Sequence, residues 1–145
     1  MYLWEFKQMH LISKQFEEIQ TLLADLKRES ESEATLIIVE GSKDIRSLEG
    51  FGIFKQVSQI QGRNFNEMCD FATKFKKIII LTDFDNAGQE LAKKLQLNLT
   101  SRGLNADLNF YNKFKFYFRK VSKDIEGLFQ IYSKVQQSRE SKLKE

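Results

Sequence analysis

The stretch Lys77-Ile78-Ile79-Ile80-Leu81-Thr82-Asp83-Phe84-Asp85-Asn86-Ala87-Gly88 decides the fold. Its apolar run lacks the alternation of a half-exposed strand, which is typical of a strand buried on both faces of a parallel sheet. The run ends in Asp83 and Asp85, and a helix is predicted to begin at Asn86. Ligands of open parallel sheets bind beyond the carboxyl ends of the strands. The stretch therefore predicts a central strand with a site at its end.

A second stretch of the same kind lies upstream, where the apolar run Leu36–Val39 ends in Glu40 and Gly41. Apolar spacing and turn residues predict helices over 42–49, 65–75, 86–102 and 123–137, and further strands over 53–57 and 110–120. The alternation of strands and helices predicts an α/β fold with right-handed crossovers. We expect a Rossmann-like central parallel sheet of about four strands, flanked by helices.

The segment 110–120 is predicted to be a half-exposed strand, because phenylalanines alternate there with cations and tyrosines. One face would then carry a candidate nucleic-acid-binding set: Tyr111, Lys113, Lys115, Tyr117 and Arg119. Cations follow a phosphate backbone, and aromatic rings stack on unpaired bases. The alternative is an edge strand whose lysines merely prevent sheet-to-sheet aggregation.

An additional amphipathic helix is predicted before the first strand, over about residues 3–28. Its apolar stripe comprises Met9, Ile12, Phe16, Ile19 and Leu23. We favour a helix that covers the sheet, and the alternative is an arm that binds a protein partner or a second copy. The chain then divides into an N-terminal helical extension and linker (1–34), a central α/β domain (35–132) and a charged C-terminal end (133–145).

Composition narrows the class of protein. No apolar run approaches the roughly 18 residues of a membrane span, and the N-terminus does not resemble a signal peptide. The single cysteine, Cys69, excludes an internal disulfide, so we expect a cytoplasmic protein without a membrane partner. The only histidine, His10, excludes a histidine-rich metal site. The net charge is +3, and the C-terminal third is its most basic part, which suggests an anionic partner.

Three carboxylates are expected to face one crevice at the edge of the sheet: Glu40, Asp83 and Asp85. No basic residue neighbours them in sequence, and such a cluster is costly unless a proton or a cation neutralises it. Oxygen ligands without histidine or cysteine select Mg²⁺ or Mn²⁺, and phosphate chemistry is the usual role of that ion. The alternative is that the aspartates cap the following helix, although capping does not explain Glu40.

The stretches Ile37–Asp44 and Ile80–Gly88 resemble the two signature motifs of the Toprim domain. This domain is shared by topoisomerases, bacterial-type primases and the ribonuclease that matures bacterial 5S rRNA. The resemblance covers about residues 36–128 and is closest to the small stand-alone archaeal Toprim proteins. Lys123–Leu128 also resembles a closing motif of those proteins. The central domain is thus identified as a member of the Toprim family.

The resemblance implies roles for individual residues. Glu40 would be the general acid or base, and Asp83 and Asp85 would bind Mg²⁺, with Mn²⁺ as a substitute. Accessory positions would be Gly41, Asp44, Gly88, Asp124 and Glu126, although the three acids among them also suit helix N-termini. One departure is Gln89, where several members of the family have glutamate.

The function that we predict from the sequence is a small Mg²⁺-dependent nuclease, with RNA favoured as the substrate and DNA possible. A nuclease needs only a metal, a proton-transfer group and a cationic approach, whereas 145 residues leave no room for the further domains of a topoisomerase. Two alternatives are a non-catalytic RNA- or DNA-binding subunit of a larger processing or degradation complex and a primase-like nucleotidyl transferase.

Overall fold

The computed structural model describes residues 3–143. In this part of the chain a four-stranded parallel sheet has the strand order β2-β1-β3-β4. The strands are β1 (Thr35–Val39), β2 (Val57–Gln59), β3 (Lys77–Leu81) and β4 (Asn105–Asp107). The helices are α1 (Leu3–Lys14), α2 (Phe16–Ser30), α3 (Ser42–Glu49), α4 (Phe65–Ala72), α5 (Asn86–Ser101), α6 (Asn109–Phe118) and α7 (Ile125–Leu143). The predicted α/β fold with a parallel sheet is confirmed.

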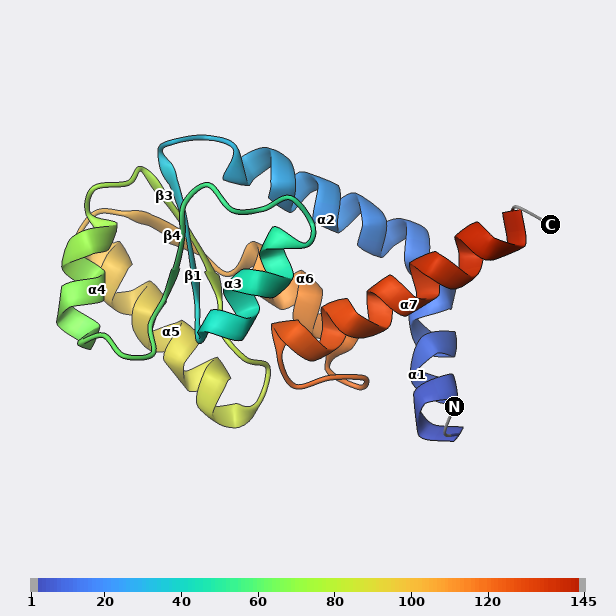
Figure 1. Cartoon of the computed structure of the whole chain (residues 1–145). Coiled ribbons are helices and arrows are strands. Elements are labelled where there is room, and N and C mark those ends of the chain that lie inside the picture. Colours follow the sequence, from blue (N-terminus) through green and yellow to red (C-terminus); the bar gives the residue numbers. More distant parts are fainter. Residues whose placement is uncertain (1–2, 144–145) are drawn as a thin grey trace.

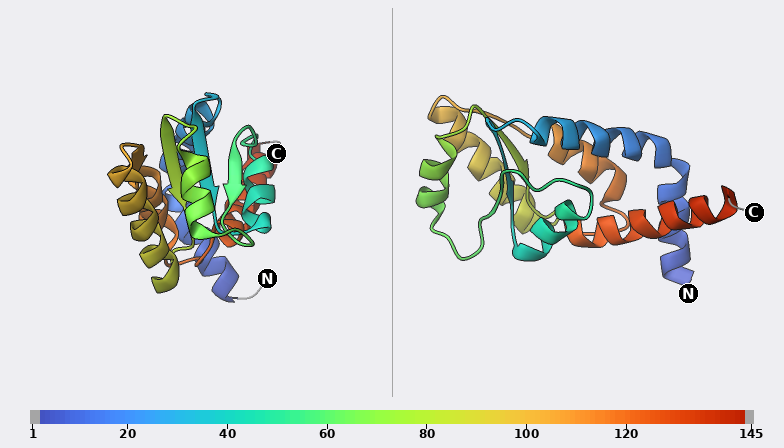
Figure 2. Two further views of the ribbon diagram at one scale, coloured as in Figure 1. Left: turned by 90° about the vertical axis from the view of Figure 1, so that its left-hand side faces the viewer. Right: turned by 45° about the horizontal axis from the view of Figure 1, so that its top comes forward.

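Helices cover both faces of the sheet. Figure 1 shows α4 and α5 on one side and α2, α3, α6 and α7 on the other. The left view in Figure 2 agrees, since α4 lies there in front of the sheet. The two central strands, β1 and β3, are therefore buried on both faces, and every residue of β1 is buried. This burial explains why their sequences are apolar runs without alternation.

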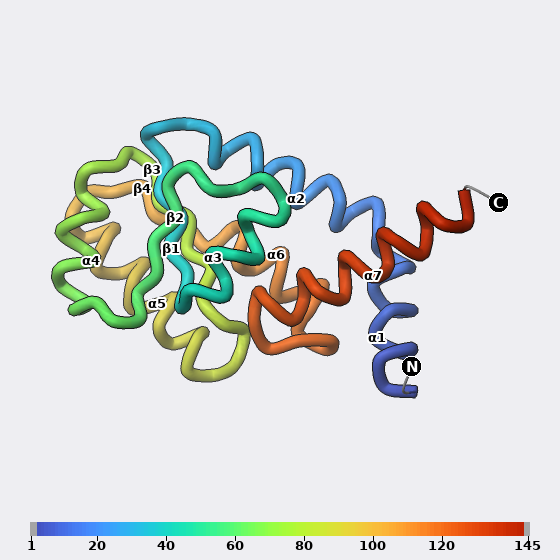
Figure 3. Tube along the Cα trace, viewed as in Figure 1, coloured from blue at the N-terminus to red at the C-terminus, as the bar shows by residue number. Residues whose placement is uncertain are grey.

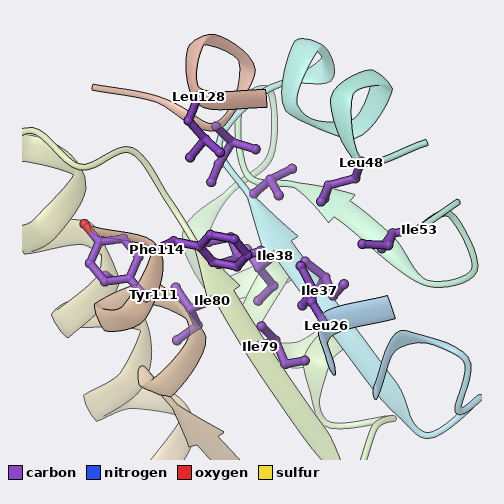
Figure 4. Close-up of a cluster of buried hydrophobic side chains, with 14 of the residues drawn as sticks. Leu26, Ile37, Ile38, Leu48, Ile53, Ile79, Ile80, Tyr111, Phe114 and Leu128 are labelled. Carbon is purple, nitrogen blue, oxygen red and sulfur yellow. The ribbon is translucent and has the colours of Figure 1, made fainter. Parts of the chain in front are cut away.

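The main core lies between the sheet and the helices that Figure 4 draws around it. Ile38 and Ile80 are fully buried and come from the two central strands, while Phe114 of α6 and Leu128 of α7 approach from outside the sheet. Burying aliphatic and aromatic side chains of this size contributes roughly 1.5–3 kcal/mol each. The core therefore joins the C-terminal helices firmly to the two strands that carry the acidic motifs.

The strand predicted over 110–120 is wrong, because this segment forms helix α6. Tyr111, Phe114 and Phe118 are buried, and their spacing of three and four residues is that of one helix face. The predicted set of Tyr111, Lys113, Lys115, Tyr117 and Arg119 therefore does not share one strand face. The fourth strand is instead the short β4, whose Ile79–Asp107 pairing extends the sheet beyond β3.

The predicted N-terminal helix is two helices, which are separated at Gln15. The apolar stripe is packed within the protein as expected, with Ile12, Phe16 and Ile19 buried. Helix α2 packs against β1 and α6, whereas α1 packs against α7. Figure 3 shows α1 crossing α7 at the end of the molecule away from the sheet.

Several element boundaries also differ from the prediction, among them the end of α4 at Ala72 rather than residue 75. The second strand begins at Val57 rather than Ile53, because Ile53 is buried in the turn that follows α3. The last helix continues past Gln137 to Leu143. No helix within residues 3–143 has the combination of length and apolar character that crossing a membrane requires.

Candidate active site

The two acidic motifs meet because their strands are neighbours in the sheet. Val39 pairs with Leu81 at the carboxyl ends of β1 and β3, so Glu40 and Asp83 follow at the same edge. The backbone NH of Asp83 donates a hydrogen bond to Oε1 of Glu40 (3.0 Å). The predicted proximity of these two carboxylates is therefore a direct consequence of the parallel register.

Gly88 holds the second motif in a tight turn. A Cβ atom at this position would lie 2.0 Å from the backbone oxygen of Asp83, closer than any real contact. Its carbonyl accepts a hydrogen bond from the Thr82 hydroxyl (2.7 Å), and its NH donates to Oδ1 of Asp85 (2.8 Å). Only glycine fits here, and the turn fixes the backbone on both sides of Asp83.

Tyr111, which is predicted on an exposed strand face, is instead buried and contacts the site. Its ring is buried against Phe84, and its hydroxyl donates to the backbone oxygen of Asp83 (2.7 Å). Burial raises the pKa of Tyr111 to about 12, with the nearby carboxylates adding to the shift. The phenol is therefore a stable donor at neutral pH, and it ties α6 to the second motif.

Replacing Tyr111 with phenylalanine is expected to lower the free energy of unfolding by about 1 kcal/mol, since the carbonyl of Asp83 loses a donor. The measurement is the urea midpoint at constant m-value. Tyr132→Phe is the matched control, because the ring of Tyr132 is equally buried and its hydroxyl makes no hydrogen bond within residues 3–143. Equal midpoints for the two variants would contradict the assignment.

A cavity of about 290 Å³ opens beside the two motifs. Its acidic lining residues are Glu40, Asp44, Asp83, Asp124 and Glu126. Of the predicted site residues, Gly41 also lines the cavity, whereas Asp85 does not. The cavity thus collects carboxylates from both motifs and from the beginning of α7.

Asp44 and Asp124 each accept a backbone hydrogen bond near the beginning of a helix. Asp44 is buried and accepts a hydrogen bond from the backbone NH of Gly41 (3.1 Å). Asp124 accepts from the NH of Gly127 (2.8 Å) in the first turn of α7. Burial raises the pKa of Asp44, although the backbone NH groups of Gly41 and Glu126 act to lower it. These contacts agree with a role at helix N-termini.

Asp83 has the most perturbed carboxyl group of the cavity. Burial first, and then the charges of Glu40, Asp44, Asp124 and Asp85, raise its pKa to about 7. The cluster thus has more negative charge than its surroundings neutralise. A bound cation or a retained proton relieves such repulsion.

The donor chemistry of the cavity fits Mg²⁺, because Glu40 and Asp83 supply only oxygen atoms and the acids that line the cavity outnumber its cation, Lys43. Within residues 3–143 no three histidine, cysteine or acidic side chains gather closely enough to enclose an ion. Mg²⁺ keeps several waters and binds through one or two carboxylates together with substrate phosphates. Asp83 would hold it, and Glu40 lies beside Asp83 through the hydrogen bond from the Asp83 NH.

The remaining predicted residues lie outside the cavity. Asp85 is exposed and caps α5, as its alternative interpretation proposed. Gln89 donates from Nε2 to the carbonyl of Phe84 (2.8 Å), a bond that glutamate at this position would not provide. Lys113 is exposed, and the ammonium group of Lys115 lies 5.8 Å from the ring centre of Tyr111. Gln61 was missed, because nothing in its loop sequence indicates that it lies beside Gly41.

Comparison with known proteins agrees with this arrangement. The Toprim domain matches residues 35–118, which include both motifs, and the chain therefore belongs to the Toprim domain family. Toprim domains are found in nucleases and primases, so membership indicates a function related to nucleic acids. Toprim domains also generally bind Mg²⁺.

More particularly, the chain is similar to small archaeal UPF0292 proteins. It is 35% identical over 130 residues to a UPF0292 protein from Methanosarcina barkeri, covering 88% of this chain and 89% of that protein. It is also 35% identical over 99 residues to one from Pyrococcus abyssi, covering 68% and 75%. The structure of a protein from Aquifex aeolicus aligns with a TM-score of 0.62 and 30% identity, covering 68% of this chain and 89% of that one.

Proposed function

We propose that the protein is a Mg²⁺-dependent nuclease that hydrolyses phosphodiester bonds, with RNA as the favoured substrate. The observation that supports this proposal is the contact between the motifs, in which Glu40 and Asp83 line one cavity and the Glu40 carboxylate accepts the NH of Asp83. The raised pKa of Asp83 also supports it, because a carboxylate surrounded by other acids is stabilised by a positively charged ligand.

In the proposed reaction Glu40 takes the proton of a water molecule that attacks phosphorus. The bond from phosphorus to the leaving ester oxygen breaks, and that oxygen takes up a proton from solvent. Bound Mg²⁺ supplies charge stabilisation at the phosphate oxygens. The hydrogen bond from Asp83 orients the Glu40 carboxylate, while Gly88 and Tyr111 fix the backbone of Asp83. A general base in this position contributes about 10²- to 10⁴-fold in rate.

The test is incubation of the protein with labelled single-stranded RNA, structured RNA and single-stranded DNA, each in Mg²⁺, Mn²⁺ or EDTA. We expect cleavage of RNA that requires a divalent ion. Absence of cleavage from every substrate, with binding of strands retained, would overturn the proposal. That outcome would support the alternative of a binding subunit, which the exposed, capping Asp85 favours.

Replacing Asp83 with asparagine is expected to change how stability depends on pH. The folded pKa of about 7 lies above the unfolded value of 3.8, so the wild type loses stability as pH rises from about 4 to 7. Because the side chain is partly exposed, we expect a loss of about 1–2 kcal/mol rather than the full value of the shift. The variant lacks this decline, so it should be the more stable protein at pH 8 and equal to the wild type at pH 4.

Urea unfolding at both pH values, with and without MgCl₂, measures this difference. Mg²⁺ should stabilise the wild type and leave Asp83→Asn unchanged, since only a ligand of the folded state raises stability. Asp107→Asn, at the end of β4 and outside the cavity, is the matched control. If Asp83→Asn were the less stable protein at pH 8, the carboxylate would be structural.

A further inference from the structure

A cationic groove lies between the end of α1 and the end of α6, outside the acidic cavity. Its volume is about 270 Å³. The lining residues are Leu11, Lys14, Gln15, Phe116, Tyr117, Arg119 and Lys120. Three of them are cations and none is acidic. Within residues 3–143, none of the three cations forms an ion pair.

The groove also presents aromatic surface to solvent. The side chain of Phe116 is 71% exposed, although its neighbours Phe114 and Phe118 are fully buried. The ring of Tyr117 packs edge-on against Phe116, with the ring centres 5.2 Å apart. Helix α6 therefore packs onto the protein with the ring of Phe116 left in solvent. A large exposed ring beside cations is typical of a surface that stacks on bases.

One acid lies near the groove. Glu18, in the first turn of α2, faces the hydroxyl of Tyr117, and together with burial it raises the pKa of that phenol. Glu18 belongs to α2 and does not line the groove. All three cations that line the groove are exposed, so the groove presents positive charge to solvent.

The chain connects the groove directly to the acidic cavity. Residues 119–124 leave α6 and end in Asp124, which lines the cavity. The NH of Phe84 donates to the carbonyl of Lys123 (2.7 Å), which fixes this segment against the second motif. Lys120 and Asp124 are four residues apart, so their Cα atoms lie within about 14 Å. A single strand of a few nucleotides is long enough to span that distance.

We propose that the cationic groove binds the backbone and an unpaired base of a single-stranded nucleic acid whose scissile phosphate lies in the acidic cavity. This inference rests on the proposed function and names its substrate class. Lys14, Arg119 and Lys120 contact phosphates, and Phe116 stacks on a base. The groove needs α1, so the N-terminal helices extend the substrate site beyond residues 35–118, the part that matches the Toprim domain.

A second copy of the chain is the competing occupant. The exposed apolar side chains of α1, which include Trp4 and Phe6, would suit contact with another copy. A two-fold contact across the groove, however, would bring Lys14, Arg119 and Lys120 close to the same cations of the partner. Like charges placed together oppose association, whereas the phosphates of a strand neutralise them. The charge of the groove therefore favours nucleic acid.

The test is fluorescence anisotropy of labelled 12-nucleotide oligo-U and oligo-dT strands, with a duplex of equal length as a third arm. It is carried out in EDTA at several salt concentrations, so that no cleavage occurs. The triple variant Lys14→Gln, Arg119→Gln, Lys120→Gln should bind single strands roughly tenfold or more weakly, and its log–log salt slope should be flatter by about 2. The control variant Lys74→Gln, Lys76→Gln, Lys93→Gln removes the same charge from other exposed positions and should change little.

A second pair of variants isolates the ring. Phe116→Ala should weaken single-strand binding by roughly fivefold or more, with no change in salt slope. Phe54→Ala is the matched control, because its side chain is 69% exposed in the segment before β2 and does not line the groove. Both substitutions remove an exposed ring, so both variants should fold with wild-type stability.

The proposal is overturned if the groove and control variants bind single strands equally well, or if the duplex binds as tightly as oligo-U. It is also overturned if Phe116→Ala dissociates a dimer in sedimentation while strand affinity stays constant, since the groove would then be an interface between copies. Strand binding that depends on the groove, without cleavage in Mg²⁺, would overturn only the proposed nuclease activity. A preference between oligo-U and oligo-dT would distinguish RNA from DNA.

Discussion

Replacing Glu40 with glutamine is expected to reduce the rate of strand cleavage by about 10²- to 10⁴-fold. The proposed mechanism gives the Glu40 carboxylate the proton of the attacking water, and an amide does not accept it. The amide oxygen of glutamine still accepts the hydrogen bond from the NH of Asp83. The variant should therefore keep its fold and its affinity for strands while it loses activity.

Single-turnover cleavage in Mg²⁺ and strand binding in EDTA measure the two effects separately. Glu90→Gln is the matched control, since Glu90 is exposed on α5 and does not line the acidic cavity. Wild-type cleavage by Glu40→Gln would remove Glu40 from the mechanism. Weaker binding together with lower stability would instead indicate that the carboxylate mainly holds the two motifs together.

Gly88→Ala is expected to be the most destabilising of the substitutions proposed for this protein, at about 2–4 kcal/mol. A β-carbon would lie 2.0 Å from the oxygen and 2.5 Å from the carbonyl carbon of Asp83, and both of these are backbone atoms. The turn must open to admit the methyl group. Opening it strains the bonds from the Thr82 hydroxyl to the Gly88 carbonyl and from the Tyr111 hydroxyl to the Asp83 carbonyl.

Urea unfolding of Gly88→Ala and Gly50→Ala provides the comparison. A β-carbon at Gly50 would lie 3.3 Å from the nearest backbone oxygen, which a small adjustment relieves. In a helix, alanine is intrinsically more favourable than glycine by about 1 kcal/mol. Because Gly88 lies in the first turn of α5, a destabilised Gly88→Ala variant would have to result from the steric clash, and a stable one would show that the turn is not closely packed. Mg²⁺ should stabilise Gly88→Ala less than the wild type, because the displaced backbone carries Asp83.

The local pattern of the sequence determined the central part of the fold. The runs Leu36–Val39 and Ile78–Leu81 are apolar throughout because both faces of β1 and β3 are buried, and this signal does not depend on distant residues. Parallel strands place their carboxyl ends at one edge, so the proximity of Glu40 and Asp83 followed as well. Glu40 and Asp83, the pair whose proximity the sequence predicted, directly follow two adjacent strands.

The segment of α6 was ambiguous in sequence. Phe114 and Phe118 are four residues apart, so they share a face in a strand of period two and also in a helix of period 3.6. The structure distinguishes the two, because Tyr111, three residues before Phe114, is also buried and its hydroxyl donates to the Asp83 carbonyl. β4 (Asn105–Asp107) carries no apolar run and is a strand because it pairs with β3. Tertiary packing settled both elements.

Only the tertiary structure decided the electrostatics and the surfaces of this protein. The raised pKa of Asp83 depends on burial and on acids from three separate segments, including Asp44 and Asp124. The cationic groove joins Lys14 to Arg119 and Lys120, which more than a hundred residues of chain separate. Sequence periodicity reports what one element buries, whereas charge clusters and grooves depend on the distances between elements, and these exist only in the folded chain.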